Sequence, residues 1–203
     1  MNKTDYNKEM ENILNNLTCK PKLLLHACCA PCSTSVLERL NKFFDITIFF
    51  YNPNMDTEEE FIKRQTEIVN LVNLLNKDEN KIKVITTKYN HIEFLNKIKG
   101  DENEKEGGSR CEKCFYLRLT KTCLFAKENN YNYFTTTLSV SPYKNAEMLN
   151  KIGKELEEKY KVNFLVADFK KKDGYLNSIK LSKLYNLYRQ DYCGCEFSKI
   201  LKN

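Results

Sequence analysis

Short runs rich in β-branched and aromatic residues alternate with longer helical patterns along this chain. The runs predicted as strands are 22–27, 46–51, 82–87, 133–139 and 164–169. The segments predicted as helices lie near 33–43, 58–76, 91–99, 110–129 and 144–160. Strands that alternate with helices form parallel sheets covered on both faces. The pattern therefore predicts an α/β fold with a doubly wound, mostly parallel five-stranded sheet.

A further helical pattern at 175–192 runs into the sequence CGC, which predicts a C-terminal helical segment that carries cysteines. Neither an internal repeat nor a Pro- or Ser-rich linker divides the 203 residues, and chains of this size commonly form one domain. We therefore expect a single domain over 1–203, in which residues 1–20 are a polar N-terminal extension.

Nine cysteines in a chain without an apolar segment near its N-terminus favour metal or redox chemistry over a disulfide framework. No stretch approaches the roughly 18 apolar residues that span a bilayer. We expect a cytoplasmic protein with no membrane partner. The net charge of +6 suits an RNA partner, but ordinary proteins often carry such a charge.

The first cysteine motif, CCAPC, places Cys28, Cys29 and Cys32 directly after the first predicted strand. In open parallel sheets, ligands bind outside the carboxyl ends of the strands, where the strand order reverses. We therefore expect these thiols at the ligand-binding edge of the sheet.

The second motif, GGSRCEKC, precedes a long helical pattern. Ser109 followed by Glu112 matches a capping box, which predicts Ser109 as the helix N-cap. Cys111 and Cys114 then lie three residues apart on one helix face. Because a helix N-terminus favours negative charge, it supports thiolates as metal ligands.

The third motif, CGC, consists of Cys193, Gly194 and Cys195. Glycine adopts backbone angles closed to other residues, so it can turn two thiols toward one site. They could chelate a metal or form a readily reduced disulfide.

Seven cysteines lie in motifs whose spacing is typical of ligating or redox thiols, whereas Cys19 and Cys123 are interpreted as ordinary structural residues. An all-cysteine zinc site and an iron-sulfur cluster both fit the seven, and the spacing does not choose between them. We interpret His26, inside the first strand, as a buried histidine hydrogen-bonded to a neighbour.

Five segments together resemble one family, the QueH-type epoxyqueuosine reductases. They are LLLHACCAPCS, YNPN, RCEKCFYLRL, FTTTLSVSPYKN and KDGYLNSIKLSKLYNLYRQDYCGC, in this order between about residues 22 and 198. Three separate cysteine motifs in order are far more specific than any one of them. The chain departs from the family pattern after YNPN, near Met55 to Thr57, where a hydrophobic residue and a proline are expected.

The resemblance implies an oxidoreductase that converts epoxyqueuosine to queuosine at the wobble position of tRNA, by a two-electron reduction without cobalamin. It also implies a HUP-like fold. The implied partners are the tRNA anticodon loop and a low-potential electron donor of the ferredoxin or flavodoxin type.

By matching position, the resemblance implies that a [4Fe-4S] cluster is held by four cysteines, namely Cys28, Cys29, Cys111 and Cys114. Cys193 and Cys195 would be a redox-active pair or ligands of an additional iron, with Cys32 beside them. These three thiols would form the second centre that two-electron chemistry calls for.

Residues next to the motifs supply candidate substrate contacts and proton donors. Arg110, Lys144 and Arg189 are candidate phosphate or substrate contacts, and Asp191 and Tyr143 are candidate proton donors. Two alternatives are an ATP-using tRNA-modifying enzyme of similar fold and a non-enzymatic zinc-binding RNA module. The first is disfavoured because the loop after the first strand lacks the glycines that cradle phosphates; metal analysis would identify the second.

Overall fold

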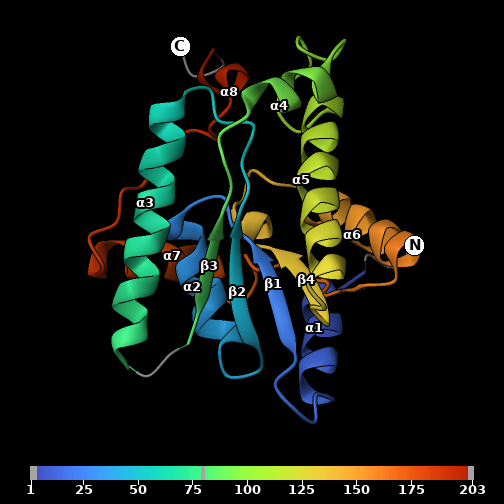
Figure 1. Ribbon diagram of the computed structural model, residues 1–203, viewed down its shortest axis with the longest axis vertical. Coiled ribbons are helices and arrows are strands. Elements are labelled where there is room, and N and C mark those ends of the chain that lie inside the picture. Colours follow the sequence, from blue (N-terminus) through green and yellow to red (C-terminus); the bar gives the residue numbers. More distant parts are fainter. Residues whose placement is uncertain (1–3, 79–80, 201–203) are drawn as a thin grey trace.

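The computed structural model describes residues 4–78 and 81–200. Its sheet consists of β1 (Lys22–His26), β2 (Asp45–Phe50), β3 (Lys83–Thr86), β4 (Tyr133–Thr136) and β5 (Asn163–Phe164). The strand order is β3-β2-β1-β4-β5, and every neighbouring pair is parallel. Figure 1 shows the sheet between its helices. The predicted α/β doubly wound fold is confirmed.

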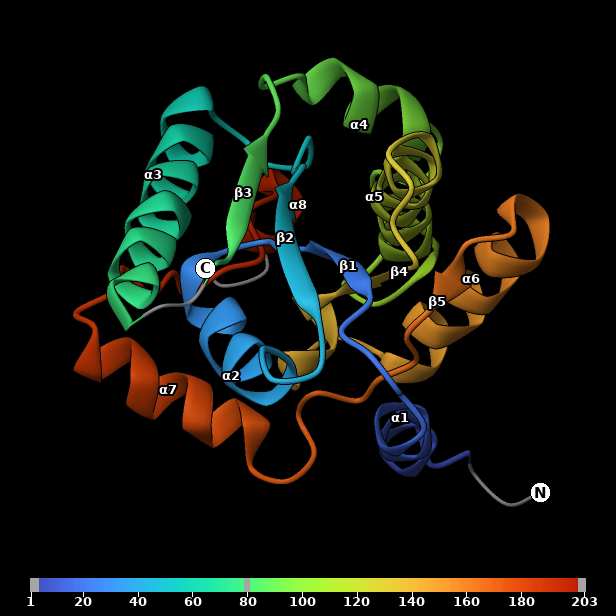
Figure 2. The same ribbon diagram turned by 60° about the horizontal axis from the view of Figure 1, so that its bottom comes forward.

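Helices cover both faces of the sheet (Figure 2). On one face α2 (Ala30–Leu40) packs against α3 (Glu58–Leu75) and α7 (Gly174–Leu184), and on the other α5 (Ser109–Glu128) packs against α6 (Ala146–Tyr160). The remaining helices are α1 (Tyr6–Asn15), α4 (His91–Ile98) and α8 (Glu196–Ile200), with 3-10 turns η1 (Asn76–Asp78) and η2 (Thr137–Val140). Within the described ranges, none of these helices has the length and apolarity to cross a membrane.

The apolar run of β1 is buried on both faces. Leu23 and Leu25 belong to the core beneath α2 and α3, whereas Leu24 belongs to the core beneath α5 and α6. All three side chains are fully buried. A strand covered on both faces needs this continuous hydrophobic sequence, and burying each leucine contributes about 1.5–3 kcal/mol.

The N-terminal segment contains a helix that the sequence analysis did not predict. Asp5 caps α1 by accepting hydrogen bonds from the backbone N–H groups of Asn7 and Lys8, both at 3.1 Å. Met10 and Leu14 lie one turn apart and are buried in the core. Residues 6–15 are therefore part of the packed fold rather than a polar extension.

The predicted strand at 164–169 is regular only at residues 163–164. Its neighbour β4 ends at Thr136, where the chain enters η2, so the later residues lack a strand partner. Side chains replace the missing ladder: Asn150 donates to the Ala167 carbonyl and accepts from the Ala167 N–H, both at 2.9 Å. The Ser139 hydroxyl accepts from the Phe169 N–H at 3.2 Å.

The strand order reverses between β1 and β4. From β1 the chain builds outward to β2 and β3, and then returns to place β4 and β5 on the other side of β1. The segments that follow β1 and β4 therefore flank the crevice at the carboxyl edge of the sheet. This is the position predicted for the first cysteine motif.

Candidate functional site

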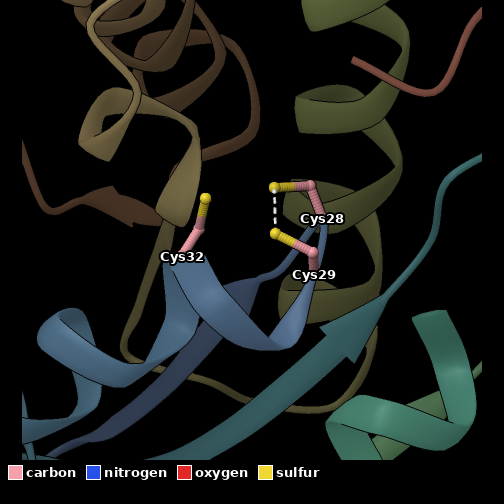
Figure 3. Close-up of side chains that lie close together, drawn as sticks. All are labelled: Cys28, Cys29 and Cys32. Atoms are coloured by element: carbon pink, nitrogen blue, oxygen red, sulfur yellow. Dashed lines mark hydrogen bonds between the residues drawn. The ribbon is translucent and has the colours of Figure 1, made fainter. Parts of the chain in front are cut away.

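The CCAPC motif forms the turn from β1 into α2. Cys29 is the N-cap of α2 in an extended conformation, and Pro31 occupies the first helical turn, where its missing N–H is tolerated. The helix therefore begins at Ala30, three residues before the predicted start. Cys32 then lies in the first turn of α2, and its side chain points toward the same space as those of Cys28 and Cys29 (Figure 3).

The three thiols of this motif form a compact group. Their sulfur atoms all lie within 4.8 Å of one another, and the Cys28 and Cys29 sulfurs are 3.6 Å apart. Cys28 Sγ also lies 3.8 Å from Thr137 Oγ1, which follows β4. This contact joins the segments on the two sides of the crevice, so the motif occupies the switch point of the sheet.

The three thiols share negative charge unequally. Hydrogen bonds from Cys29 and Cys32 hold the pKa of Cys28 well below its ordinary value. The hydrogen bond to Cys28 raises the pKa of Cys29 to about 12, and the pKa of Cys32 is raised by its hydrogen bonds to Cys28 and Cys29. Among the three thiols, Cys28 is therefore the one that ionises most readily. A bound cation would favour deprotonation of the others as well, because thiolates are the ligating form.

The second motif lies at the start of α5, but its cap differs from the prediction. The N-cap is Gly108 and not Ser109, and no side chain caps this end of the helix. The Gly108 carbonyl accepts a hydrogen bond from the Glu112 N–H at 3.1 Å. The predicted capping box is therefore wrong by one residue. Cys111 and Cys114 are both buried in the first turns, as predicted. The Gly107 N–H donates to Cys111 Sγ at 3.2 Å, and burial raises the pKa of Cys114 to about 11.

The third motif contacts the side chain of Lys144. Gly194 adopts φ +113°, as expected for a glycine that turns the chain between two thiols. Cys193 Sγ lies 3.1 Å from Lys144 Nζ. A hydrogen bond from Cys195 and the charge of Lys144 hold the pKa of Cys193 well below its ordinary value, whereas the hydrogen bond to Cys193 raises that of Cys195.

The two cysteines of the second motif lie in apolar clusters that also involve cysteines of the first and third motifs. Cys28 packs against the apolar cluster that contains Cys111. Cys114 and Cys195 belong to one small cluster with Phe94 and Ile98. The seven motif cysteines are all free thiols. Cys123 is fully buried far along α5, which agrees with its interpretation as a structural residue.

A cavity of about 500 Å³ opens over the thiols. It joins the first and third motifs, because Cys28, Cys32 and Cys193 line it. Its polar lining includes most of the predicted substrate and proton-transfer residues, namely Tyr143, Lys144, Arg189 and Asp191. The combination of thiols, cations and an open cavity is suited to binding an anionic substrate beside a redox or metal centre.

The predicted contacts differ in exposure. Tyr143 is 78% exposed at the cavity, whereas Lys144 is buried and pairs with Glu106 at 2.9 Å. The Arg189 guanidinium lies over the Tyr175 ring, 5.5 Å from its centroid. Arg110 is buried, does not line the cavity, and donates to the backbone carbonyls of Glu102 and Glu104. Arg110 thus holds the loop before α5.

Two buried arginines at this site, Arg64 and Arg118, were not predicted from the sequence. Each is 1% exposed. Arg118 follows Cys114 by one helical turn, and its charged side chain within an apolar stripe was a detectable signal. Arg64 shows the same signal, because it lies in the apolar stripe of α3 between Phe61 and Ile68, but its approach to Cys193 depends on the packing of α3. The interpretation of His26 is confirmed: it is fully buried, and its Nδ1 lies 2.8 Å from Thr136 Oγ1.

Sequence comparison identifies the family. The family model described as "Epoxyqueuosine reductase QueH" matches residues 23–200. The chain belongs to this family. Relatives named Epoxyqueuosine reductase QueH include one from Staphylococcus epidermidis that is 41% identical over 206 residues, covering 98% of this chain and 86% of the relative.

More distant QueH relatives match over similar lengths. The Streptococcus pyogenes protein of that name is 37% identical, covering 94% of this chain and 75% of its own length. The Thermotoga maritima protein is 35% identical, and the match covers 88% of this chain and 90% of the relative. The QueH match spans all three cysteine motifs and the cavity residues, so the predicted resemblance is confirmed.

Proposed function

We propose that this chain reduces epoxyqueuosine to queuosine in tRNA. The observation that carries the proposal is the convergence of the first and third cysteine motifs on one cavity at the switch point of the sheet, with the cysteines of the second motif packed in the apolar clusters beside them. Membership in the QueH family supplies the substrate. The reaction removes the epoxide oxygen as water and leaves a carbon-carbon double bond, which consumes two electrons and two protons.

The donor set fits an iron-sulfur centre. Sulfur is the soft ligand that such clusters use, and three thiol sulfurs lie within 4.8 Å of one another. Arg64 Nη2, which is buried and has no hydrogen-bond partner among the described residues, also fits a missing anionic group. We propose that Cys28, Cys29, Cys111 and Cys114 hold a [4Fe-4S] cluster, which when bound supplies electrons one at a time.

The remaining thiols supply the second centre of the proposal. A Cys193–Cys195 dithiol that becomes a disulfide releases two electrons and two protons, which balances the removal of one epoxide oxygen as water. An additional iron held by these cysteines is the alternative. Lys144 stabilises the Cys193 thiolate in either case, because its ammonium group lies 3.1 Å from that sulfur. Cys32, at the cavity wall, is the third thiol of this proposed centre.

Cavity residues are proposed to bind and protonate the substrate. Arg189 contacts RNA phosphate, and Lys144 at the cavity floor contacts the substrate as well as Cys193. Tyr143 and Asp191 are proposed proton donors at the mouth. Arg110 contributes indirectly, because it fixes the loop that carries Glu106.

The proposed partners are the anticodon loop of tRNA and a low-potential donor of the ferredoxin or flavodoxin type. The net charge of +6 supports an RNA partner. The proposed compartment is the cytoplasm, where free thiols stay reduced.

The test is a conversion assay without air. Anticodon stem-loop RNA carrying epoxyqueuosine is incubated with iron-loaded protein and a low-potential reductant, and its nucleosides are analysed by mass spectrometry. Queuosine is expected with loaded protein and absent with metal-free protein. If the loaded protein returns the RNA unchanged, the proposed function is wrong.

A further inference from the structure

Arg118 carries a buried positive charge that has no carboxylate partner among the residues that the structure describes. Its side chain is 1% exposed. Its guanidinium donates to Asn52 Oδ1 at 2.5 Å and lies 3.3 Å from His26 Nε2. None of the ion pairs found in residues 4–78 and 81–200 includes Arg118. A buried charge without a counter-charge is costly, so its presence in the fold needs a reason.

The hydrogen-bond partners of Arg118 provide no negative charge. His26 is a fully buried imidazole, which supplies no negative charge whether it is protonated or not. Asn52 is neutral and is itself held by a hydrogen bond to the Ala27 carbonyl at 2.9 Å. Both partners orient the guanidinium. Neither partner therefore balances the charge of Arg118, and the proposed ligand Cys114 lies one helical turn before it on α5.

The electrostatic environment of the thiols includes Arg118. Hydrogen bonds from neighbouring thiols lower the pKa of Cys28 first, and the charge of Arg118 lowers it further. Arg118 also lies one helical turn after Cys114 on α5, and both side chains are buried. Its partner His26 stands two residues before Cys28, and its partner Asn52 holds the Ala27 carbonyl, so the guanidinium lies beside the first and second motifs.

Arg64 reaches the thiol-lined cavity from α3, on the opposite face of the sheet from α5. Its Nε donates to Glu60 at 2.6 Å and its Nη1 to the Cys193 carbonyl at 3.3 Å. Its Nη2 is buried without a partner among the described residues. A Cβ at position 194 would lie 3.2 Å from Nη1, so the guanidinium packs directly against the CGC turn.

We infer that Arg118 and Arg64 are the fixed counter-charges of the cysteine-bound metal centre, and that they hold its reduction potential above the value that four thiolates alone would give. The inference rests on the metal centre of the proposed function and goes beyond it. Thiolate ligands give such a centre a net negative charge, and reduction adds another. Fixed cations inside a low-dielectric region favour the reduced form. Both arginines are positioning residues in this role.

The test compares reduction potentials. Wild type, Arg118→Met and Arg118→Lys are loaded with iron and sulfide without air and titrated with redox dyes, and absorbance reports the midpoint. We expect the Arg118→Met change to lower the equilibrium constant for one-electron reduction at least tenfold, which is 59 mV. Arg118→Lys should retain most of the wild-type value. Arg64→Met should shift the midpoint less, because Glu60 already shares the charge of Arg64.

Arg39→Met is the matched control, since Arg39 pairs with Glu11 at 3.1 Å and does not line the thiol cavity. Its midpoint should equal that of wild type. A second measurement, thermal unfolding of metal-free and loaded protein, separates charge from structure. Arg118→Met should reduce the stabilisation gained on metal loading and should not lower the stability of the metal-free form. A folded Arg118→Met protein that no longer takes up iron, while Arg118→Lys does, also supports the inference.

Two results would overturn the inference. One is an Arg118→Met midpoint equal to that of wild type. The other is an equal loss of thermal stability in metal-free and loaded Arg118→Met, or its failure to fold in either form, which would assign Arg118 a structural role only. Wild-type protein that binds no iron would instead refute the proposed metal centre, so the two failures are distinguishable.

Discussion

Lys144 and Cys193 form a partly buried pair, in which Nζ lies 3.1 Å from Sγ while Glu106 accepts from the same ammonium group at 2.9 Å. The cation lies 49 residues before the thiol in sequence, so the fold creates the pair. With a hydrogen bond from Cys195, the charge of Lys144 holds the pKa of Cys193 well below its ordinary value. Replacing Lys144 is therefore the most direct way to change the charge next to the third motif.

Replacing Lys144 by methionine should slow the alkylation of Cys193. Because Lys144 contributes to the lowered pKa of this thiol, its loss raises the pKa and reduces the thiolate fraction at pH 7, by up to about tenfold for each unit of rise. The rate is measured with iodoacetamide on metal-free protein, followed by peptide mass spectrometry. Lys154→Met is the control, since Lys154 pairs with Glu9 on the surface. Equal alkylation rates in all three proteins would refute the role of Lys144.

Replacing Cys29 by serine should abolish iron binding, whereas replacing Cys123 by serine should not. Cys29 lies in the thiol group, and Cys123 is fully buried with Leu156 nearby. The Cys123→Ser change should cost about 1–3 kcal/mol of stability, because it buries a hydroxyl. Iron content and urea unfolding measure the two effects. If both variants hold wild-type iron, the assignment of Cys29 fails.

Replacing Cys32 by serine distinguishes two uses of this thiol. The proposed ligand set leaves it out, although its sulfur lies within 4.8 Å of those of Cys28 and Cys29. We expect Cys32→Ser to keep its iron and its brown colour and to lose activity. Iron and acid-labile sulfide analysis shows whether Cys32 is a cluster ligand. Loss of the cluster in Cys32→Ser would mean that Cys32 is a ligand and that one of the four proposed cysteines is not.

The buried His26 should make the metal-free protein sensitive to mild acid. Its pKa is about 3 in the fold and about 6.5 in an unfolded chain, so between these values the unfolded state binds one proton more. Stability therefore falls as pH decreases from about 6.5, by about 1.4 kcal/mol per pH unit from this group. Urea unfolding between pH 7 and 5 should show a flatter dependence in His26→Gln. Identical slopes would contradict the burial of a neutral ring.

The sequence predicts the sheet well because periodicity reports burial directly. The run Leu23 to Leu25 is apolar without interruption because both faces of β1 are covered, and this placed CCAPC at the correct edge. The helix α1 was missed because its polar surface residues dominate the composition, although Met10 and Leu14 already have helical spacing.

The rest of the site depends on tertiary contacts that no local pattern encodes. Arg64 lies 129 residues before Cys193, whose carbonyl it contacts, and only the packing of α3 beside the CGC turn joins them. The sequence pattern predicts Ser109 as the N-cap, but the observed N-cap is Gly108. The capping-box motif does not reveal at which of these two neighbouring residues the backbone becomes helical. The residues that line the cavity could not be predicted either, because they come from several separate segments of the chain.

A single-turnover experiment tests the account most directly. Iron-loaded protein is fully reduced, freed of reductant without air, and mixed with excess epoxyqueuosine RNA. Two centres that together store at least two electrons should give about one queuosine per chain, whereas Cys195→Ala should give only traces because one cluster delivers one electron. Absence of queuosine with the wild-type protein, or equal yields from wild type and Cys195→Ala, would contradict the account.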